Sequence, residues 1–206
     1  MTSAKSFVRP VPVCIPVKRA GDGGPPQVVI WIPGTQASSL ETYRVRELVY
    51  LSLGSNVGDR AENLNAAIDR LRAFGEVGAV SSFYETEPVE FTAQPWFLNC
   101  AVQLNTEKTS KELLDGILDI EQQLGRRRGR QKGPRIIDLD ILLFGNSIVK
   151  APGLAIPHPA MHERRFVLEP LAEIAPEAHH PTLKRTVQEL LDALPPGQAV
   201  RKISKS

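Results

Sequence analysis

The chain has 206 residues, of which 42% are apolar and 23% are charged, and its formal net charge is +2. This composition indicates a globular protein with one core of fair size, and it excludes a disordered chain or a bulk polyanion-binding protein. The two cysteines have no metal-ligand neighbours and no apolar run is as long as a membrane span, so we predict a soluble cytoplasmic protein without a disulfide framework or zinc site.

Residues 1–47 differ from the rest of the chain. They contain six prolines and the breaker cluster GDGGPP at 21–26. Short β-prone pieces such as QVVIWIP occur, but no periodic pattern is long enough to bury a face. We therefore predict a flexible extension over residues 1–47 and a folded domain over residues 48–200. A targeting or partner-binding arm is the alternative, and no motif in the segment favours it.

The folded domain is expected to begin with a strand and a helix. The segment LVYLSLGS predicts a short strand that ends at Gly54. Asp59, followed three positions later by Glu62, resembles a capping box and predicts a helix start. Apolar residues then recur at helical spacing until Gly75, which predicts the end of the helix. They are Leu64, Ala67, Ile68, Leu71 and Phe74.

The next segments continue this pattern of strands and helices. VGAVSSFYET and FLNCAVQLNT both predict strands, and Thr109 with Glu112 predicts the start of a second helix, which ends at Gly125. A further strand is predicted over 136–144 and a short helix over 187–194. The order β-α-β-β-α-β predicts an α+β fold with a ferredoxin-like core, in which a mainly antiparallel four-stranded sheet lies in an α/β/α sandwich.

The stretch GPRIIDLDILLFG, residues 133–145, places Asp138 and Asp140 at alternate positions of an apolar strand. Their side chains would point to the same face about 6.5 Å apart, and two like charges at that distance repel by about 2.5 kcal/mol at an effective dielectric near 20. Such a pair is tolerated most readily when a cation lies between the carboxylates. The alternative is structural, with one aspartate paired to Arg135 and the other at a solvated edge.

A basic segment precedes the two aspartates. Residues 126–135, RRRGRQKGPR, contain six cationic residues and no acid. A solvated loop or a nucleic-acid patch would explain such a run by itself, but beside two carboxylates it supplies the groups that neutralise a polyphosphate with Mg²⁺. Downstream, IPHPAMHERRF adds His158, Arg164 and Phe166, although a structural role for His158 stays open. The earlier loop LGSNVGDR matches no nucleotide-binding glycine motif and predicts a plain strand-to-helix turn.

Several separate blocks follow one another along the chain: LSLGSNVGDR, SSFYETEPV, WFLNCAV, IEQQLGRRRGR, GPRIIDLDILLFG and IPHPAMHERRFVLEPLAEIAP. In this order they resemble the 6-hydroxymethyl-7,8-dihydropterin pyrophosphokinase family of folate biosynthesis, over about residues 48–195. The resemblance implies transfer of pyrophosphate from ATP to the hydroxymethyl oxygen of the pterin, with AMP as the leaving group. We expect a monomer that binds these two substrates and has no nucleic-acid or membrane partner.

The resemblance assigns the phosphate chemistry to particular residues. Asp138 and Asp140 would hold two Mg²⁺ ions that bridge the triphosphate, and Arg126 and Arg135 match the catalytic arginines of the family. The implied ATP-binding residues are Glu121, Arg128, Lys132, His158 and Arg164. Glu121 falls on the apolar phase of its predicted helix, and an ion pair at the helix edge is the alternative for it.

The resemblance also assigns the pterin site. The Asn99 amide offers both a donor and an acceptor to the amide-like edge of a pterin, and two aromatic rings would stack on its faces. By spacing alone, the two aromatic residues would be core residues. Lys132 stands where many members carry an aromatic residue that closes over the site, which leaves the lid packing open. The implied pterin-binding residues are Thr86, Val89, Phe97, Asn99 and Phe166.

Two other functions compete with this one. A non-catalytic RNA-binding module would use the arginine-rich segment on a ferredoxin-like sheet, but the sequence lacks exposed aromatic stacking pairs on its predicted central strands. An inactive pyrophosphokinase, kept as the partner subunit of another folate enzyme, is disfavoured because Asp138, Asp140, Arg126 and Arg135 are all present.

Overall fold

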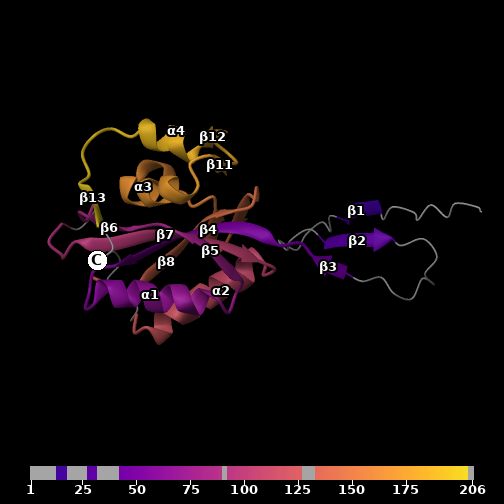
Figure 1. Ribbon diagram of the computed structural model, residues 1–206, viewed down its shortest axis with the longest axis horizontal. Helices are drawn as coiled ribbons and strands as arrows, with labels where there is room; N and C mark the ends of the chain where they lie inside the picture. The colour runs from indigo at the N-terminus through magenta and orange to yellow at the C-terminus, as the bar shows by residue number, and fades with distance from the viewer. Residues whose placement is uncertain (1–12, 18–26, 32–41, 90–91, 127–132, 204–206) are drawn as a thin grey trace, which may run out of the picture. The chain divides into compact units, whose positions relative to one another are not determined.

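A computed structural model of the protein describes residues 13–17, 27–31, 42–89, 92–126 and 133–203, and the chain divides into two compact units, residues 1–45 and 46–206. In the first unit, three short strands form an antiparallel sheet (Figure 1). They are β1 (Val13–Val17), β2 (Gln27–Trp31) and β3 (Thr42–Arg44). Because much of this unit lies outside the described residues, the predicted flexibility of residues 1–47 stays a prediction.

The second unit is built on a six-stranded antiparallel sheet. Its strands are β4 (Glu47–Ser55), β5 (Glu76–Val80), β6 (Phe83–Thr86), β7 (Phe97–Thr106), β8 (Asp138–Phe144) and β13 (Val200–Ile203). β4 pairs with β7 on one side and with β8 on the other, while β5 and β6 both pair with β7, and β13 pairs with β6. Four strands were predicted, and two more arise because the predicted second strand is divided into β5 and β6 at Ser81–Ser82 and because β13 adds an edge strand.

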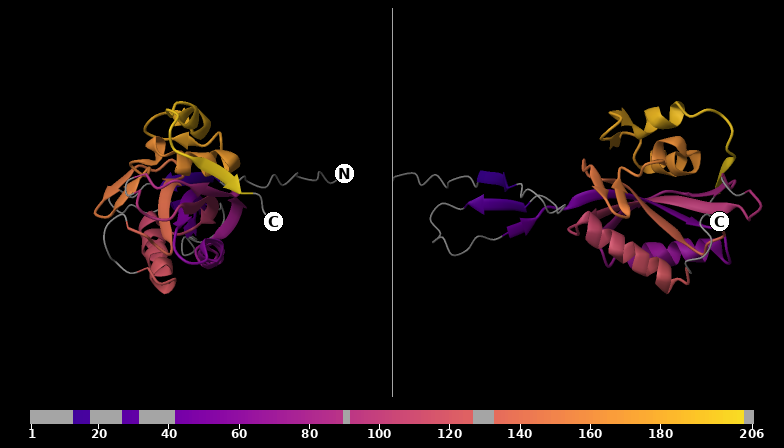
Figure 2. Two further views of the ribbon diagram at one scale, coloured as in Figure 1. Left: turned by 90° about the vertical axis from the view of Figure 1, so that its left-hand side faces the viewer. Right: turned by 180° about the vertical axis from the view of Figure 1, so that it is seen from behind.

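Helices cover both faces of this sheet (Figures 1 and 2). α1 (Arg60–Leu71) and α2 (Ser110–Gln123) lie on one face, whereas α3 (Arg165–Ile174) lies on the other with α4 (Val187–Asp192) packed against it. The unit is therefore a mixed α/β fold around an antiparallel sheet. The remaining elements are β9 (Val149–Ala151), β10 (Leu154–Ile156), the 3₁₀ helix η1 (Met161–Glu163), β11 (His179–His180) and β12 (Arg185–Thr186).

Alternate residues of the central strands face opposite layers, as the two-residue period of a strand requires. Leu51 and Leu53 of β4 are fully buried in the core that the sheet forms with α1 and α2. Ser52 and Gly54 consequently face the α3 side. The alternation predicted for β7 is confirmed, because its residues in the same core are Leu98, Cys100, Val102 and Leu104.

The predicted starts of α1 and α2 are confirmed, whereas α1 ends at Leu71, before the predicted end at Gly75. Asp59 is the N-cap of α1, and its carboxylate accepts a hydrogen bond from the backbone N–H of Glu62 at 3.0 Å. Thr109 and Glu112 form the predicted capping box of α2. A cap of this kind stabilises a helix by about 1 kcal/mol, so both helices have locally encoded starts.

α3 was not predicted from the sequence. Pro170 lies inside this helix and removes one backbone donor. The helix forms because its apolar side is buried against the sheet in a second core, with Val167, Leu168 and Leu171 at its centre. Within the described ranges, no helix is long and apolar enough to span a membrane.

Candidate active site

A cavity of about 320 Å³ opens on the α3 side of the sheet, next to the area that α3 covers. Its floor comes from β4, β6, β7 and β8, and its rim from the β6–β7 connection and the segment 158–166. Apart from Glu121, every predicted site residue that the structure describes lines this cavity, whereas Arg128 and Lys132 lie outside the described residues. The described lining residues are Ser52, Gly54, Thr86, Glu87, Pro88, Val89, Gln94, Phe97, Asn99, Arg126, Arg135, Asp138, Asp140, His158, Arg164 and Phe166.

The two aspartates lie side by side on the cavity floor. Strand pairing places Asp138 opposite Gly54 and Asp140 opposite Ser52. Leu139, between them, points into the opposite core, so the shared face predicted from the sequence is confirmed. The sheet alternation therefore directs two carboxylates of an apolar strand into one cavity.

Asp138 bridges two arginines. Its Oδ1 lies 2.6 Å from a guanidinium nitrogen of Arg126, and its Oδ2 forms an ion pair with Arg135. The structural alternative was an ion pair of one aspartate with Arg135 and a solvated position for the other. Its first half is realised, because Asp138 pairs with Arg135. The result is a cationic wall, formed by two guanidinium groups, directly beside the acidic pair.

Asp140 is partly buried and lies in the cavity rather than at a solvated edge. Desolvation, and then the negative charge of Asp138, raises the pKa of Asp140 to about 6. Arg164 and Arg126 act in the opposite direction and do not fully compensate. The site therefore holds negative charge that a bound cation would stabilise.

Glu121 of α2 lies beneath the cavity and is only 3% exposed. Its carboxylate forms an ion pair with Arg126 and accepts a hydrogen bond from the backbone N–H of Leu139 at 2.8 Å. Desolvation dominates and raises the pKa of this carboxyl group. Glu121 is recessed, as predicted, and it joins the end of α2 to the strand that carries both aspartates.

His158 and Arg164 reach the cavity from the segment between β10 and α3. The Nδ1 atom of His158 accepts a hydrogen bond from the backbone N–H of Ala160 at 3.2 Å. Burial, followed by the charge of Arg164, lowers the pKa of His158. The Arg164 guanidinium lies 5.7 Å from the centre of the Phe166 ring, a cation–π distance that fixes the two side chains relative to each other.

The β6–β7 side of the cavity carries the polar and aromatic residues assigned to the pterin. Asn99 is 4% exposed, and its Nδ2 donates to the Thr86 hydroxyl oxygen at 2.7 Å. This bond fixes the amide orientation, so its Oδ1 lies over Gly54. Phe97 and Phe166 both line the cavity, and Phe166 also packs against the second core, so the core alternative is partly realised for Phe166.

Asn56, in the loop predicted to be a plain strand-to-helix turn, was not among the predicted site residues. The Asn56 amide is 3% exposed and donates to Gln94 Oε1 at 3.0 Å and to the Pro95 carbonyl at 3.1 Å. Its Oδ1 accepts from the backbone N–H of Arg135 at 2.8 Å. One side chain thus joins the β6–β7 connection to the arginine that contacts Asp138, and its partners are too distant in sequence for any local pattern to indicate them.

A second cavity, of about 400 Å³, adjoins the first and shares Asp140 and His158 with it. Its walls are mostly aliphatic side chains and backbone of α2, β8 and the β9–β10 hairpin. They include Leu114, Ile117, Leu139, Ile141, Ala151, Gly153, Leu154, Ala155 and Pro159. The second cavity could therefore bind an apolar group that is attached to a phosphate chain in the first.

A cavity that combines paired carboxylates, several arginines and a neighbouring apolar chamber has the groups that phosphoryl-transfer enzymes use. Residues 50–176 match the family described as 7,8-dihydro-6-hydroxymethylpterin-pyrophosphokinase (HPPK). The chain belongs to this family.

Two bacterial pyrophosphokinases are similar to this chain over most of their own length. The 2-amino-4-hydroxy-6-hydroxymethyldihydropteridine pyrophosphokinase of Methylorubrum extorquens is 48% identical over 130 residues, which cover 62% of this chain and 82% of the relative. The enzyme of Bacillus subtilis is 46% identical over 132 residues, covering 63% and 79%. The folic acid synthesis protein fol1 of Schizosaccharomyces pombe is 37% identical over 183 residues, or 80% of this chain. This chain spans 25% of that protein's length.

Solved structures share the fold. The wild-type HPPK-DHPS of Plasmodium falciparum matches with a TM-score of 0.59 at 17% identity, covering 71% of this chain and 44% of that one. The same protein with pterin and p-hydroxybenzoate matches with a TM-score of 0.58 at 18% identity, covering 71% and 41%. At these identities the likeness shows the architecture of the chain.

Proposed function

We propose that this chain transfers pyrophosphate from ATP to the hydroxymethyl oxygen of 6-hydroxymethyl-7,8-dihydropterin, giving the pterin diphosphate and AMP in folate biosynthesis. Family membership supports the reaction. The observation that best supports the site is that one cavity holds both the carboxylates and arginines of the β8 side and the amide and aromatic residues of the β6–β7 side.

The strand spacing supports a common orientation for the two substrates. Asp138 pairs with Gly54, and Gly54 pairs with Asn99 on the next strand. Two strand spacings, about 10 Å, therefore separate the carboxylate from the amide. A pterin with its amide-like edge at Asn99 extends its hydroxymethyl group over Gly54 toward Asp138, and the missing side chain of Gly54 leaves that path open.

In this proposal Asp138 and Asp140 bind two Mg²⁺ ions together with the ATP phosphates. The residues fit, because carboxylate oxygens are hard ligands and Mg²⁺ commonly uses one or two of them with waters and phosphates. The described residues contain no group of three or more His, Cys, Asp or Glu suited to a metal, and a site completed by phosphates requires none. When bound, the metal supplies charge neutralisation and polarises the attacking hydroxyl.

The protein residues position and stabilise the transferred group. Arg126 and Arg135 already lie against Asp138, so both guanidinium groups are within reach of phosphate oxygens held at that carboxylate. Since arginine stays protonated at physiological pH, both charges are available throughout the reaction. Glu121 anchors Arg126 from below, which keeps its guanidinium in place when a phosphate competes for it.

His158 and Arg164 complete the phosphate contacts. Because Nδ1 of His158 accepts a hydrogen bond, its neutral ring carries the hydrogen on Nε2. Burial and the charge of Arg164 lower the pKa of His158, which favours the neutral ring, and in this proposal its Nε2–H donates a hydrogen bond to a phosphate oxygen. The second cavity, which begins at the same histidine, accommodates the adenosine.

We propose that the scaffold of this site is a ferredoxin-like βαββαβ arrangement. We also propose that the protein acts on ATP and the pterin as a monomer in the cytoplasm. The support for the scaffold is the spatial order β5/β6, β7, β4, β8 with antiparallel neighbours throughout, which is the strand order of a split βαβ fold. The S. pombe relative is about four times as long as the matched region, so these proposals concern the activity of this chain alone.

The test is to incubate the purified protein with MgATP and the pterin and to resolve the nucleotide products by chromatography. We expect pterin-dependent AMP, abolished in Asp138→Asn and retained in the matched control Asp119→Asn, whose carboxylate is exposed on α2. ADP in place of AMP would overturn pyrophosphoryl transfer. Full activity in Asp138→Asn would overturn the metal assignment.

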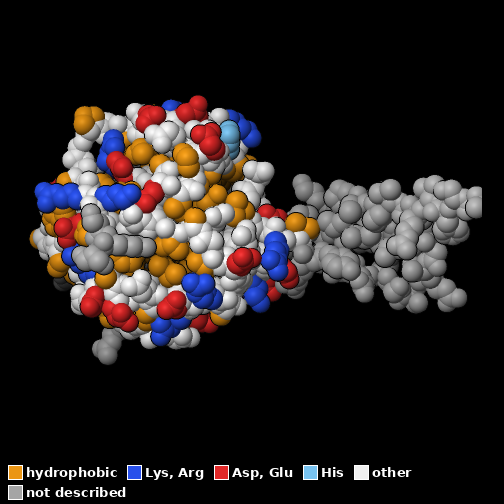
Figure 3. All heavy atoms as spheres, in the orientation of Figure 1, with side chains coloured by type: hydrophobic (Ala, Val, Ile, Leu, Met, Phe, Trp, Pro, Cys, Tyr) orange, Lys and Arg blue, Asp and Glu red, His pale blue; other side chains and the backbone are white. Residues whose placement is uncertain are grey.

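The same preparation tests the RNA-binding alternative. On the face drawn in Figure 3, coloured Lys and Arg side chains are interspersed with Asp and Glu and form no continuous basic stripe, whereas nucleic-acid binding usually uses such a stripe. Because the chain also belongs to a pyrophosphokinase family, we expect weak RNA binding. Tight binding that weakens steeply with salt and persists in Asp138→Asn would favour the alternative.

A further inference from the structure

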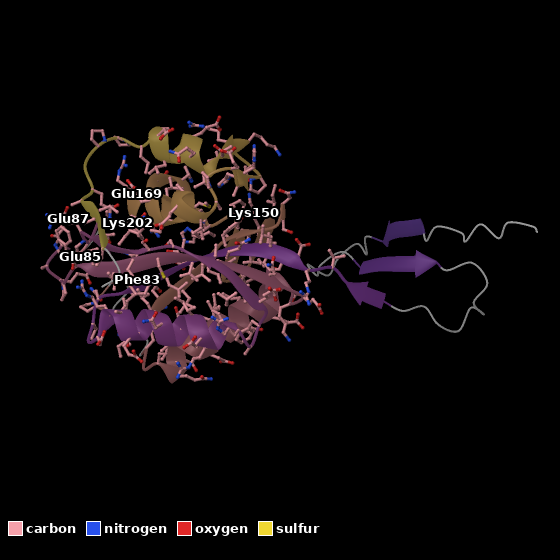
Figure 4. All side chains as sticks on the ribbon, viewed as in Figure 1. Phe83, Glu85, Glu87, Lys150, Glu169 and Lys202 are labelled. Atoms are coloured by element: carbon pink, nitrogen blue, oxygen red, sulfur yellow. The ribbon has the colours of Figure 1, made fainter. Side chains whose placement is uncertain are left out.

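The chain returns to the sheet after α4. Strand β13 pairs with β6 so that Val200 lies opposite Thr86 and Ile203 opposite Phe83. The pairing continues beyond β6, because the backbone N–H of Glu87 donates to the Ala199 carbonyl at 3.1 Å. Figure 4 shows Glu85, Glu87 and Lys202 together at the end of the sheet where β13 runs beside β6. Residues 199–203 therefore pair with β6 and with the start of the β6–β7 connection.

The side chain of Gln198 connects two separate parts of the cavity lining. Its Oε1 accepts a hydrogen bond from the backbone N–H of Phe166 at 3.2 Å, and its Nε2 donates to the Glu87 carbonyl at 3.0 Å. Phe166 belongs to α3 and Glu87 to the β6–β7 connection, and both line the cavity. A primary amide is suited to this bridge because it carries a donor and an acceptor on one planar group.

The start of α3 needs such a partner. The first N–H groups of any helix have no acceptor within the helix, and the side chain of the N-cap residue Arg164 does not cap α3. Two arginines, Arg164 and Arg165, also stand at this N-terminus, where the helix dipole disfavours positive charge. Gln198 therefore replaces the missing local cap of the turn that presents Arg164 and Phe166 to the cavity.

Further contacts hold Gln198 in place. The Arg165 guanidinium donates to the Leu194 carbonyl at 3.2 Å, and the Arg201 guanidinium lies 5.0 Å from the centre of the Trp96 ring. Lys202 pairs with Glu173 of α3 at 3.1 Å. Because the segment is fixed on both sides of Gln198, its amide occupies a defined position between α3 and the β6–β7 connection.

We propose that Gln198 is a positioning residue that sets the separation between the first turn of α3 and the β6–β7 connection, and thereby the fit of the pterin. The proposal rests on the proposed function, since it concerns the same substrate. Gln198 lines no part of either cavity among the described residues, so it acts through Phe166 and Glu87. Asp138, Asp140, Arg126 and Arg135 lie on β8 and in the segment before it, away from this bridge. Arg164 lies at the turn that Gln198 holds, so we expect ATP binding to change less than pterin binding.

The proposal predicts a selective effect on the pterin. Gln198→Ala should raise the KM for the pterin about tenfold, the order of loss expected when one hydrogen bond that shapes the site is removed. The kcat should stay within about twofold, and the KM for ATP should rise less than the KM for the pterin. Gln198→Glu keeps an acceptor for the Phe166 N–H but places a carboxylate against the Glu87 carbonyl, so it should raise the KM for the pterin as much as Gln198→Ala does. The matched control is Gln188→Ala on α4, whose Nε2 donates to Asp192 at 2.8 Å and whose loss should leave both KM values unchanged.

Binding measurements separate this proposal from the proposed function. Calorimetric titration with the pterin, in the presence of Mg²⁺ and a non-hydrolysable ATP analogue, should show an increase in Kd for both Gln198 variants that matches the change in KM. A lower melting temperature with an unchanged pterin Kd would overturn the positioning role, as would equal losses of pterin and ATP affinity. If the wild type binds pterin but forms no AMP, the proposed function fails while the variant Kd values still decide the role of Gln198. Absence of pterin binding in the wild type would overturn both.

Discussion

The substitution Gly54→Ala tests whether the cavity floor is shaped for the pterin. A Cβ atom at this position would lie 2.6 Å from Oδ1 of Asn99, where ordinary contact begins at 3.4 Å. The amide oxygen must therefore move by about 0.8 Å. Asn99 has little room to move, because it is 4% exposed and its Nδ2 is held by Thr86 at 2.7 Å. A shift of this size breaks that hydrogen bond, at a cost of about 1 kcal/mol.

We expect Gly54→Ala to lower the melting temperature by about 2–4 °C and to raise the KM for the pterin by 10- to about 100-fold. The KM for ATP should change by less than about threefold, since the phosphate-binding residues keep their places. Steady-state assays with each substrate varied in turn measure both constants. The matched control is Gly78→Ala on β5, whose Cβ would meet only Gln103 at 3.1 Å. An unchanged KM for the pterin in Gly54→Ala would refute the role given to Asn99.

Three further substitutions test other parts of the structure. Asn56→Asp keeps the acceptor for the Arg135 N–H at 2.8 Å but loses the two hydrogen bonds donated to the β6–β7 connection. The kcat should therefore fall by at least roughly tenfold, and a normal kcat in a steady-state assay would contradict this. A Gly-to-Ala change such as Gly116→Ala normally stabilises a helix by about 1 kcal/mol, but here the new Cβ would collide with the Phe74 ring. Urea unfolding should therefore show a free energy of unfolding lower by about 2 kcal/mol. An increase in that free energy would refute the packing argument. Burial raises the pKa of Glu173, yet hydrogen bonds from its neighbours outweigh this and lower the pKa below the usual 4.5. The contribution of Glu173 to stability is therefore full above that pH and disappears as the pH falls through the lowered pKa, so the melting-temperature difference between wild type and Glu173→Gln should shrink below about pH 4. A difference that stays constant with pH would contradict this assignment.

Features encoded by neighbouring residues were predictable from the sequence. The N-cap of α1 at Asp59 and the capping box of α2 at Thr109 depend on hydrogen bonds that span three residues. The common face of Asp138 and Asp140 follows from the two-residue period of any strand. In each case the physical cause lies within a few residues, so the sequence pattern contains it.

Features that depend on distant partners were not predictable. α3 contains Pro170 and begins without a local cap, so its stability comes from burial against the sheet and from a glutamine more than thirty residues away. β13 is a short strand with exposed residues, and only its pairing with β6 makes it part of the sheet. The contacts of Asn56 span 38 to 79 residues, and no window of sequence includes both ends.

The position of β4 has a consequence for folding during synthesis. β4 is the first strand of its sheet to be made, yet it lies between β7 and β8, which follow only at residues 97–106 and 138–144. Its side chains Val49, Leu51 and Leu53, fully buried in the finished protein, therefore leave the ribosome with no strand to pair with. Until β7 emerges, this apolar β-forming segment is a binding site for chaperones and a point at which nascent chains associate.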